Sequence, residues 1–386
     1  MGSDSARFDL RFWLLVSATF LGFVGIGTVL PALAPHVKRD LHGSDLIVGA
    51  VIGIFSFVAL ASRFFSGPLA DRRGRKITFL TGLLSCALAG AAYLMPIGLA
   101  SAYAGRILQG FGEACLYTGA AAWAVELAGV DRSAQALGYI SSGIWGGVSV
   151  GPVIGNWLGT FAHAAAFQFW AAIAAFGLVL LLQEDFQPRR HSGGRGALFS
   201  SLLMPGLAIG FVNVHYPVVA GFLILFLAQH GGSGPAAFTT YALVILLSRF
   251  FLGGLPDRIR PEITFYAGLA SMATGLVIIA SGPRPIFAIA GAGLLGLGFS
   301  FPWSSIASTV LRRTPAEYHG SAVGILSAFC DLFVGAGSLL AGHIAYRHGY
   351  PAAFLTGALA LAGSAFAARF VFNTRLKETP VLANAS

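Results

Sequence analysis

Long apolar runs recur about every 30 residues along the chain, and most exceed the ~18 residues that a membrane-spanning helix requires. Only 10% of the 386 residues are charged, whereas a soluble domain is usually about 25% charged. A surface with so few charges could not remain in water, which excludes an assembly of soluble domains. The sequence therefore predicts an all-α polytopic membrane protein.

Charged or Gly/Pro-rich segments separate twelve of these runs, so we predict twelve transmembrane helices. An even number of spans places both termini on the same side of the membrane. The predicted spans are Phe12–Ala34, Leu46–Ser66, Ile77–Pro96, Leu99–Trp123, Ala134–Leu158, Ala164–Gln183, Leu202–Leu227, Ala236–Gly254, Ile263–Gly282, Ile286–Val310, Gly320–Gly342 and Ala352–Phe372.

The distribution of basic residues indicates which side that is. The two tails and the alternate loops on their side hold most of the Lys and Arg outside the spans, whereas the opposite side holds Lys38, Arg39, Arg284 and Arg347. Because basic residues collect in cytoplasmic loops, we predict a protein of the cell inner (plasma) membrane with both termini in the cytoplasm. The same bias explains the net charge of +9 without a nucleic-acid partner.

One segment of the chain is repeated. Ser62–Phe79 recurs as Ser248–Phe265, with 11 of 18 positions identical at an offset of 186 residues, and the same offset relates several glycines further along. A constant offset across six spans predicts two halves of the same topology, related by an axis along the membrane normal. We therefore predict two six-helix bundles, residues 1–183 and 201–386, joined by a cytoplasmic linker at 184–200.

Five sequence segments carry a family resemblance. The loop between the second and third spans, GPLADRRGRK, resembles the signature loop of the major facilitator superfamily, and GRILQGFGEA resembles the fourth-span motif of its proton-driven members. GGVSVGPVIGN resembles the fifth-span motif of its antiporters, and FCDLFVGAG with FSFPWSS resembles arabinose-efflux-permease-like exporters in the drug:proton antiporter branch. The resemblance implies the twelve-helix major facilitator fold and alternating access.

The signature loop is expected to reverse the chain tightly, because Gly67, Pro68 and Gly74 favour turns. Its basic residues also suit a topology anchor at the anionic inner leaflet. The second copy keeps Asp257 but carries Arg260 where the first copy has Gly74. The resemblance further implies a latch that holds the two halves in one access state, formed by Gly67, Asp71, Arg72, Gly74 and Arg75.

The fifth span contains a glycine at every fourth position, with Pro152 adding a predicted bend. Small residues at this spacing let helix backbones approach closely. The stripe predicts either helix packing alone or a hinge at which the two halves seal. The residues assigned to this hinge are Gly147, Gly151, Pro152 and Gly155.

Charged residues at membrane depth are rare here, and each is a functional candidate because burying a charge in hydrocarbon is costly. Glu113, Asp331 and Arg106 lie well inside spans, and the 186-residue offset relates them to Phe299, Trp145 and Ala292. The fold therefore does not require these charges. By contrast, Arg63 and Arg249 lie near cytoplasmic ends and are expected to extend their guanidinium groups toward the interface.

Arg106, Gln109 and Glu113 share one helix face, which places Gln109 between the two charges. Burial disfavours an ionised carboxylate whereas a nearby guanidinium favours it, so such a carboxylate can bind and release a proton as access alternates. We hypothesise that Glu113 and Asp331 are the proton-coupling acids, with Arg106 and Gln109 as their partners. A satisfied structural network, or a pairing of Asp331 with a cationic substrate, is the alternative.

Aromatic and polar residues inside other spans are candidates for a substrate cavity: Tyr117, Trp145, Asn213, His215, Tyr216, Trp303, Ser304 and Phe329. A lone histidine such as His215 is also common in a packed core. We find no motif of an enzyme and predict no cofactor and no metal site. The sequence favours a monomeric exporter of a small organic solute in exchange for protons, with membrane lipids as its surroundings; the alternative is a proton-coupled symporter that imports a metabolite.

Overall fold

The structure, a computed structural model, describes residues 8–128, 132–184, 195–232, 234–252, 259–282, 284–315 and 319–373. The chain divides into two compact units, each described here by itself. Unit 1 comprises Met1–Gly43 and Ile54–Arg190, and unit 2 comprises Ser44–Gly53 and His191–Ser386. The predicted linker at 184–200 lies mostly outside the described residues, and the predicted domain limits stay a prediction.

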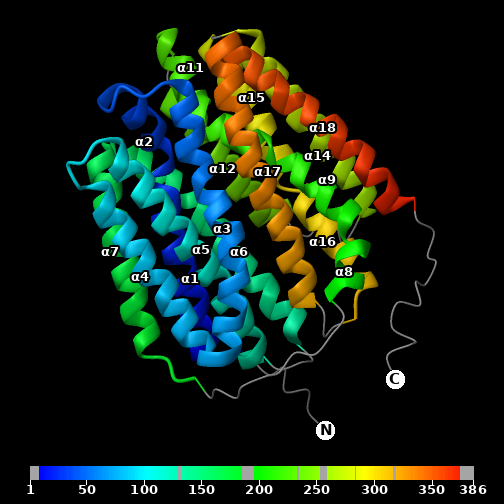
Figure 1. Cartoon of the computed structure of the whole chain (residues 1–386). Helices are drawn as coiled ribbons and strands as arrows, with labels where there is room; N and C mark the ends of the chain where they lie inside the picture. Colours follow the sequence, from blue (N-terminus) through cyan, green and yellow to red (C-terminus); the bar gives the residue numbers. More distant parts are fainter. Residues whose placement is uncertain are drawn as a thin grey trace. The chain divides into compact units, whose positions relative to one another are not determined.

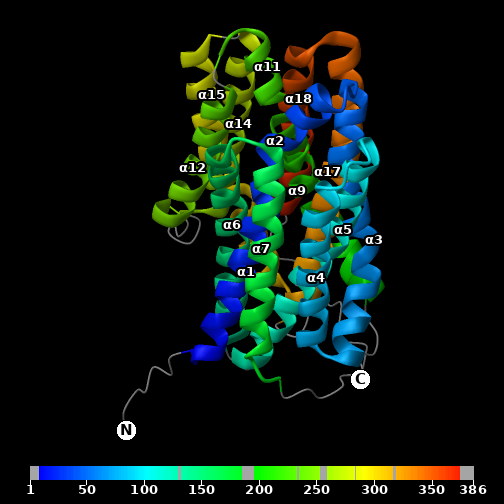
Figure 2. The same cartoon turned by 90° about the vertical axis from the view of Figure 1, so that its left-hand side faces the viewer.

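The helices of unit 1 include most of α3, whose first residues belong to unit 2. Within unit 1, α4 packs on α5 and α7, and α1 packs on α6 and α7 (Figures 1 and 2). The elements are α1 (Leu10–Thr28), α2 (Leu30–Pro35), the π-helical turn η1 (His36–Asp40), α3 (Asp45–Arg73), α4 (Arg75–Tyr93), α5 (Leu99–Ala128), α6 (Ser133–Leu158) and α7 (Phe161–Leu180).

In unit 2, α14 packs on α15 and α18, α9 packs on α17 and α18, and α12 packs on α15. The elements are α8 (Arg195–Ser201), α9 (Leu203–Asn213), α10 (His215–Val218), the π-helical turn η3 (Val219–Leu223), α11 (Ile224–Gln229), α12 (Gly234–Leu252), α14 (Pro261–Ser281), α15 (Pro285–Phe299), α16 (Pro302–Arg313), α17 (His319–His348) and α18 (Tyr350–Phe372).

Within the described residues, ten helical segments are long and apolar enough to cross a membrane. The two other predicted spans are α5 and α12, which are helical over 30 and 19 residues. Polar side chains such as Arg106, Gln109 and Glu113 lower the hydropathy of α5. The all-α polytopic membrane fold is thus confirmed.

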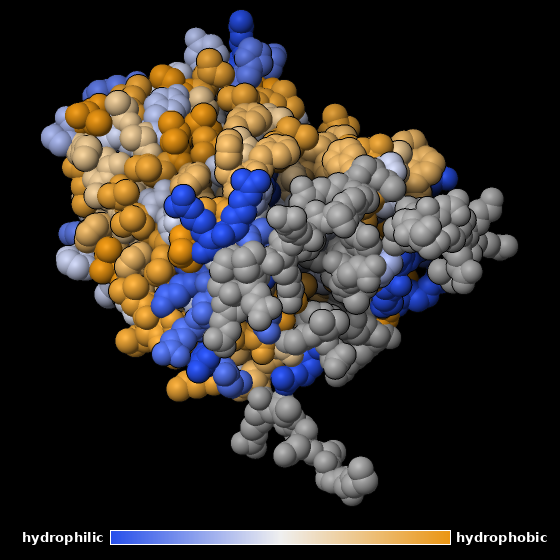
Figure 3. Space-filling model, turned by 60° about the horizontal axis from the view of Figure 1, so that its bottom comes forward, coloured by the Kyte–Doolittle hydropathy of each residue, from blue (hydrophilic) through white to orange (hydrophobic). Residues whose placement is uncertain are grey.

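The side chains exposed on the helices are largely apolar, as expected of a surface that faces lipid. Large apolar side chains remain exposed along the helices, among them Phe64 (77%), Trp157 (84%) and Leu359 (73%). Figure 3, in which the bottom of the view in Figure 1 is turned forward, shows a group of hydrophilic side chains on that face with hydrophobic side chains beside it. In water such hydrophobic surfaces would drive aggregation, whereas in a bilayer they face lipid.

Residues related by the sequence repeat make equivalent contacts in the two units. Ser85 donates to the Leu108 carbonyl at 2.6 Å, and Ser271, 186 residues later, donates to the Leu294 carbonyl at 2.7 Å. The same offset relates the close approach of α4 and α5 at Gly82 and Gly112 to that of α14 and α15 at Gly268 and Gly298. Two bundles built from one repeated design are therefore confirmed.

Several predicted spans are interrupted rather than continuous. The first continues as α1, α2 and η1, and the seventh as α9, α10, η3 and α11. The tenth breaks into α15 and α16 before Pro302, which lacks the backbone donor that a continuous helix would need.

Candidate functional site

An ion pair inside unit 1 joins α3 to α5. The Arg63 guanidinium lies 3.6 Å from the Glu113 carboxylate, and the two side chains are only 13% and 12% exposed. The same guanidinium lies 5.0 Å from the centre of the Tyr117 ring, one turn beyond Glu113 on α5. The expectation that Arg63 extends away to the interface is wrong, because its guanidinium lies inside the unit, against the Glu113 carboxylate and the Tyr117 ring.

A second polar cluster surrounds Arg106, which is 3% exposed. Its guanidinium donates to Gln109 Oε1 at 2.6 Å and lies 4.3 Å from the centre of the Phe55 ring. The Tyr93 hydroxyl also donates to Gln109 Oε1, at 3.1 Å. The helical spacing of Arg106 and Gln109 thus produces a direct contact on α5.

A fully buried residue on α7 fixes the orientation of the Gln109 amide. Gln109 Nε2 donates to Gln168 Oε1 at 2.8 Å and to the Ile26 carbonyl at 3.3 Å. Gln168 in turn donates to the Cys86 carbonyl at 2.9 Å. Because the amide nitrogen of Gln109 is held on this side, its oxygen faces Arg106. Sequence reasoning missed Gln168, since a lone glutamine in an apolar span gives no sign of its partner on another helix.

Unit 2 contains the repeat counterparts of the Arg63–Glu113 pair. Arg249 on α12 lies 5.8 Å from the centre of the Phe299 ring on α15, with two of its guanidinium nitrogens buried. Phe299 occupies the position that corresponds to Glu113. The repeat thus keeps the arginine in both units but pairs it with a carboxylate in unit 1 and with an aromatic ring in unit 2. This recurrence of arginine was the sequence signal that could have identified Arg63.

Asp331 lies on α17, one residue after Cys330, and is partly buried. The predicted cavity residue Asn213, on α9, donates to the Ile209 carbonyl at 2.8 Å and to Cys330 Sγ at 3.4 Å. Phe329, another cavity candidate, stacks on Phe199 with ring centres 5.9 Å apart. Of the predicted cavity residues, Phe329 lies on the same segment of α17 as Asp331, and Asn213 contacts that segment through Cys330.

His215 lies in the packed core of unit 2, with no exposed surface. Its Nδ1 donates to the Val212 carbonyl at 2.6 Å, so its Nε2 accepts the Tyr241 hydroxyl hydrogen at 3.0 Å. Both ring nitrogens are thus satisfied, which is the arrangement of a core histidine. The other candidates are partly buried: Tyr216 on α10, Trp303 and Ser304 on α16 and, in unit 1, Trp145 on α6.

Comparison with known proteins agrees with this architecture. The model of the Major Facilitator Superfamily matches residues 15–236 and again 220–385, so each half matches separately. The chain belongs to the major facilitator superfamily. It is a multi-pass membrane transporter.

Similar proteins carry the same family name. The chain is 29% identical over 372 residues to an uncharacterized MFS-type transporter of Salmonella typhimurium, a match that covers 92% of this chain and 95% of the relative. Uncharacterized MFS-type transporters of Burkholderia mallei and Burkholderia pseudomallei are each 28% identical over 369 residues, covering 92% of this chain and 90% of each relative.

The signature loop of this superfamily member is shorter than predicted. Helix α3 continues through Gly67, Pro68 and Asp71 to Arg73, so the tight reversal occurs at Gly74 alone, where φ is +105°. The prediction that Gly67 and Pro68 take part in the reversal is wrong. Proline is tolerated inside membrane helices because neighbouring groups can satisfy the freed carbonyl.

Beyond Gly74, the start of α4 is held by acidic side chains of unit 1. The backbone N–H groups of Arg75 and Lys76 donate to the two carboxylate oxygens of Glu184, at 2.6 and 3.0 Å. The buried Arg75 guanidinium also pairs with Glu126 of α5 and lies 3.9 Å from Glu184. Asp71 is partly buried and Arg72 is exposed, both in the last turns of α3. The second-copy residues Asp257 and Arg258 lie outside the described residues.

The glycine stripe of α6 faces α1 within the same unit. A Cβ added at Gly147 would lie 2.6 Å from the Phe20 carbonyl, and one at Gly151 would lie 2.5 Å from the Val24 carbonyl. At Gly155 the Thr28 carbonyl is closer still, and Pro152 packs against Gly27. The stripe therefore packs two helices of unit 1 on each other. Its role as a hinge between the halves stays a prediction.

Proposed function

We propose that this transporter exports a small organic solute, a drug, sugar or metabolite, in exchange for protons. It works by alternating access, as a member of the drug:proton antiporter branch, in the cell inner membrane with both termini in the cytoplasm. Its partners are the solute, protons and membrane lipids, and it acts as a monomer. The single observation that supports proton coupling best is the buried Arg63–Glu113 ion pair.

The ion pair suits a proton-coupled step because its strength depends on one proton. While Glu113 is ionised, a guanidinium 3.6 Å away attracts it in surroundings that exclude most water. A proton on Glu113 removes that attraction and frees Arg63 and α3 to move relative to α5. Phe299, its repeat counterpart, cannot take up a proton, so only one of the two equivalent positions can act in this way.

Asp331 is the second proposed proton-coupling acid, and Arg106 with Gln109 the proposed supporting charge and amide. The hydrogen bonds that orient Gln109 toward Arg106 support a fixed cation in unit 1 rather than a mobile one. Asn213 and Phe329, near Asp331 within unit 2, are proposed to contact the solute.

The test begins with the substrate. Expression of the chain in a pump-deficient host, screened for resistance to toxins and for secreted metabolites, identifies a solute. That solute is then loaded into proteoliposomes that contain the purified protein in known orientation, and proton movement is followed with a pH-sensitive dye. Exchange predicts that protons move opposite to the solute. Protons that move with the solute would instead establish the import-type symporter.

Variants of Glu113 and Asp331 test whether these acids couple transport to protons. Glu113→Gln and Asp331→Asn should each abolish the stimulation of transport by a pH gradient, because neither amide can bind and release a proton. Glu262→Gln serves as the control, since Glu262 lies at the start of α14 in an exposed pair with Arg260. Full pH-gradient stimulation in both Glu113→Gln and Asp331→Asn would refute the assignment.

A further inference from the structure

Three helices of unit 2 meet at one end of that unit, where α14 begins and where α16 and α18 end. The Arg313 guanidinium, in the last turn of α16, donates to the Val371 carbonyl in the last turn of α18 at 2.8 Å. Arg369 of α18 interacts electrostatically with Tyr266 of α14, whose hydroxyl donates to the Ala365 carbonyl at 3.4 Å. These contacts hold the end of α18 against both neighbouring helices.

These helix ends carry an excess of positive charge. Glu262, at the start of α14, pairs with Arg260 at 2.9 Å, so this pair is neutral overall. Arg312, Arg313 and Arg369 have no carboxylate partner among the residues that the structure describes, and all three are exposed. A guanidinium carries five N–H donors, so Arg313 can bind a ligand while it donates to α18. This end of unit 2 therefore favours an anion.

The scaffold that the two units share does not require these arginines. The 186-residue offset relates Arg369 to Gln183 and Arg313 to Leu127, and neither of these residues of unit 1 is charged. A topology signal needs only basic residues near the membrane surface, so it does not explain why arginines gather on adjoining helix ends. Their placement points to a ligand that binds there.

An apolar stripe on α18 leads to Arg369. Its members recur at intervals of four or seven residues, which places them on one face of the helix: Leu355, Leu359, Phe366 and Phe370. All four are exposed, and the Phe366 and Phe370 rings pack edge to face with centres 5.3 Å apart. Arg369 follows Phe366 by three residues, so its charge lies one turn beyond that ring, at the edge of the stripe. A row of apolar contacts that ends at a cation matches a phospholipid, whose acyl chains join a charged headgroup.

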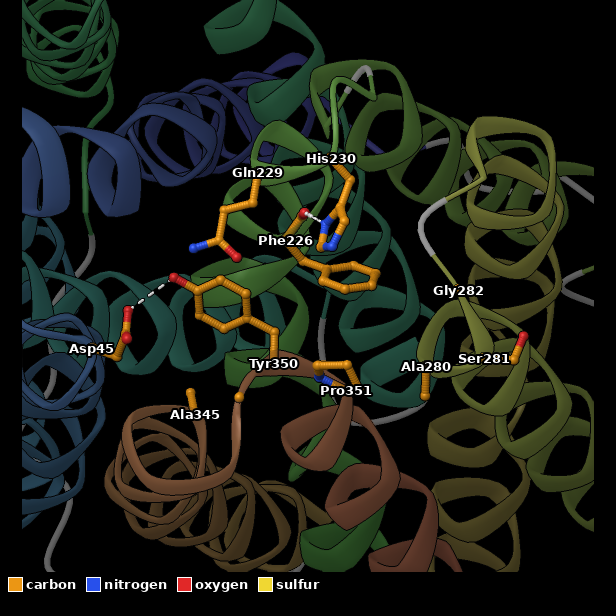
Figure 4. A pocket seen from close by; sticks show the side chains of 11 residues that line it. Asp45, Phe226, Gln229, His230, Ala280, Ser281, Gly282, Ala345, Tyr350 and Pro351 are labelled. Atoms are coloured by element: carbon orange, nitrogen blue, oxygen red, sulfur yellow. Dashed lines mark hydrogen bonds between the residues drawn. The ribbon is translucent and has the colours of Figure 1, made fainter.

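The opposite end of α18, where the helix begins, has a different character. The Tyr350 hydroxyl donates there to Asp45 Oδ1, at 3.0 Å, beside a cavity of about 420 Å³ (Figure 4). Asp45 is the first residue of α3 and belongs to unit 2. Among the described residues that line this cavity, none is Lys or Arg. This cavity thus offers no cation to an anionic headgroup, whereas the far end of α18 does.

We propose that the end of α18 binds an anionic phospholipid, with its phosphate on Arg369 and one acyl chain along Leu359 and Phe366. Arginine binds phosphate through parallel N–H···O bonds, and the charges of Arg312 and Arg313 add to the attraction. A zwitterionic lipid would bring a positive group toward three arginines, and a free phosphate would leave the apolar stripe without a partner. The site lies at the end predicted to be cytoplasmic, where the leaflet carries anionic lipids. It goes beyond the exchange of a solute for protons and does not depend on that function.

The experiment uses the full-length chain in lipid nanodiscs that contain equal amounts of anionic phosphatidylglycerol and zwitterionic phosphatidylcholine with identical acyl chains. A photoreactive benzophenone amino acid, introduced in place of Phe366, is crosslinked to the adjoining lipid, and mass spectrometry gives the ratio of the two lipids captured. Each arginine near the surface favours an anionic lipid about fivefold, so phosphatidylglycerol should be captured about tenfold or more over phosphatidylcholine. The same amino acid in place of Leu355, near the start of α18, should capture the two lipids equally. A ratio below about threefold at Phe366, or equal ratios at the two positions, would overturn the proposal.

Variants at the same helix ends locate the headgroup. Arg369→Gln should lower the ratio at Phe366 about fivefold, whereas Arg369→Lys should retain most of it because lysine keeps the charge. The control combines Arg260→Gln with Glu262→Gln, which removes an arginine together with the carboxylate that balances it, and should leave the ratio unchanged. An unchanged ratio in Arg369→Gln, or an equal loss in the control, would show diffuse attraction to the surface and overturn the assignment.

Folding of the variants does not limit the test, because Arg369 is exposed and its side chain makes no hydrogen bond to the described residues. If Arg369→Gln nevertheless fails to fold, the comparison of the Phe366 and Leu355 positions decides the matter. Excess inorganic phosphate should leave the captured ratio unchanged, since a free ion makes no contact with the apolar stripe. A ratio that falls to that of the bulk lipid would make the free anion the ligand and overturn the phospholipid.

Discussion

Breaking the Arg63–Glu113 ion pair should reveal a coupling energy of about 2–3 kcal/mol between the two side chains. At the observed separation of 3.6 Å, the gross attraction of two unit charges is about 4–5 kcal/mol at an effective dielectric constant of ~20. The separation exceeds the ~2.8 Å of a charge-assisted hydrogen bond, and burial of both charges offsets part of the attraction. We therefore expect a coupling energy of about half the gross value.

The perturbation is a double-mutant cycle of Arg63→Met and Glu113→Gln. Methionine keeps an apolar stem of similar length, and glutamine keeps the shape of glutamate. Arg63→Met alone leaves a buried carboxylate without its cation and should cost about 3–5 kcal/mol of folding free energy. In the Glu113→Gln background the same change should cost about 2–3 kcal/mol less. The free energy of unfolding is measured by reversible SDS titration of the purified protein in mixed micelles.

The repeat provides the matched control. Arg249→Met with Phe299→Leu tests the equivalent positions in unit 2, where the guanidinium lies 5.8 Å from the ring centre. A cation–π contact of this kind contributes about 0.5–1 kcal/mol, so its coupling energy should be well below that of the ion pair. A coupling energy below about 0.5 kcal/mol for Arg63 and Glu113, or equal values in the two cycles, would refute this account of the site.

Three further predictions concern backbone packing and the buried amide network. Gly151→Ala should destabilise the protein by about 1–3 kcal/mol, because the added Cβ would lie 2.5 Å from a carbonyl oxygen of α1; Gly138→Ala on the same helix meets no atom within 4 Å and should be neutral or stabilising in a thermal melt. Gly74→Ala should cost about 1–3 kcal/mol, since φ is +105° there, whereas Gly67→Ala in the helical part of the motif should not, as SDS titration would show. Gln168→Leu removes a donor and an acceptor from the Gln109 network and should cost about 1–3 kcal/mol; a melting temperature equal to that of the unaltered protein would contradict the role of that network.

The architecture of this transporter could be predicted from its sequence because hydrocarbon leaves few alternatives for a chain. Backbone groups in a bilayer must be bonded internally, so long apolar runs become helices whatever else surrounds them. The repeat added the two-bundle topology, since equivalent segments fold alike. The helix limits were less predictable: α3 continues through Gly67 and Pro68 because a proline in a membrane helix removes only one hydrogen bond.

Contacts between side chains on different helices could not be predicted from the sequence in the same way. Arg106 and Gln109 lie three residues apart on one helix, so their contact follows from helical geometry. Arg63 and Glu113 are 50 residues apart, and only the packing of α3 against α5 determines that they meet. Gln168 and Gln109 meet across α7 and α5 for the same reason. The glycine stripe of α6 predicted a close helix contact, but α1 as its partner became evident only from the folded unit.

The repeat offers a way to separate scaffold from function in this chain. Ser85 and Ser271 make the same hydrogen bond in the two units, so that contact belongs to the shared scaffold. Arg63 and Arg249 are also equivalent, but Glu113 and Phe299 are not, and the substitution changes a partner that can bind a proton into one that cannot. If proton coupling depended only on the contacts that the two units share, the positions of Glu113 and Phe299 could have kept the same residue. Because a buried charge is costly and the equivalent position folds without one, the carboxylate at Glu113 supports the proposal that this position binds and releases a proton.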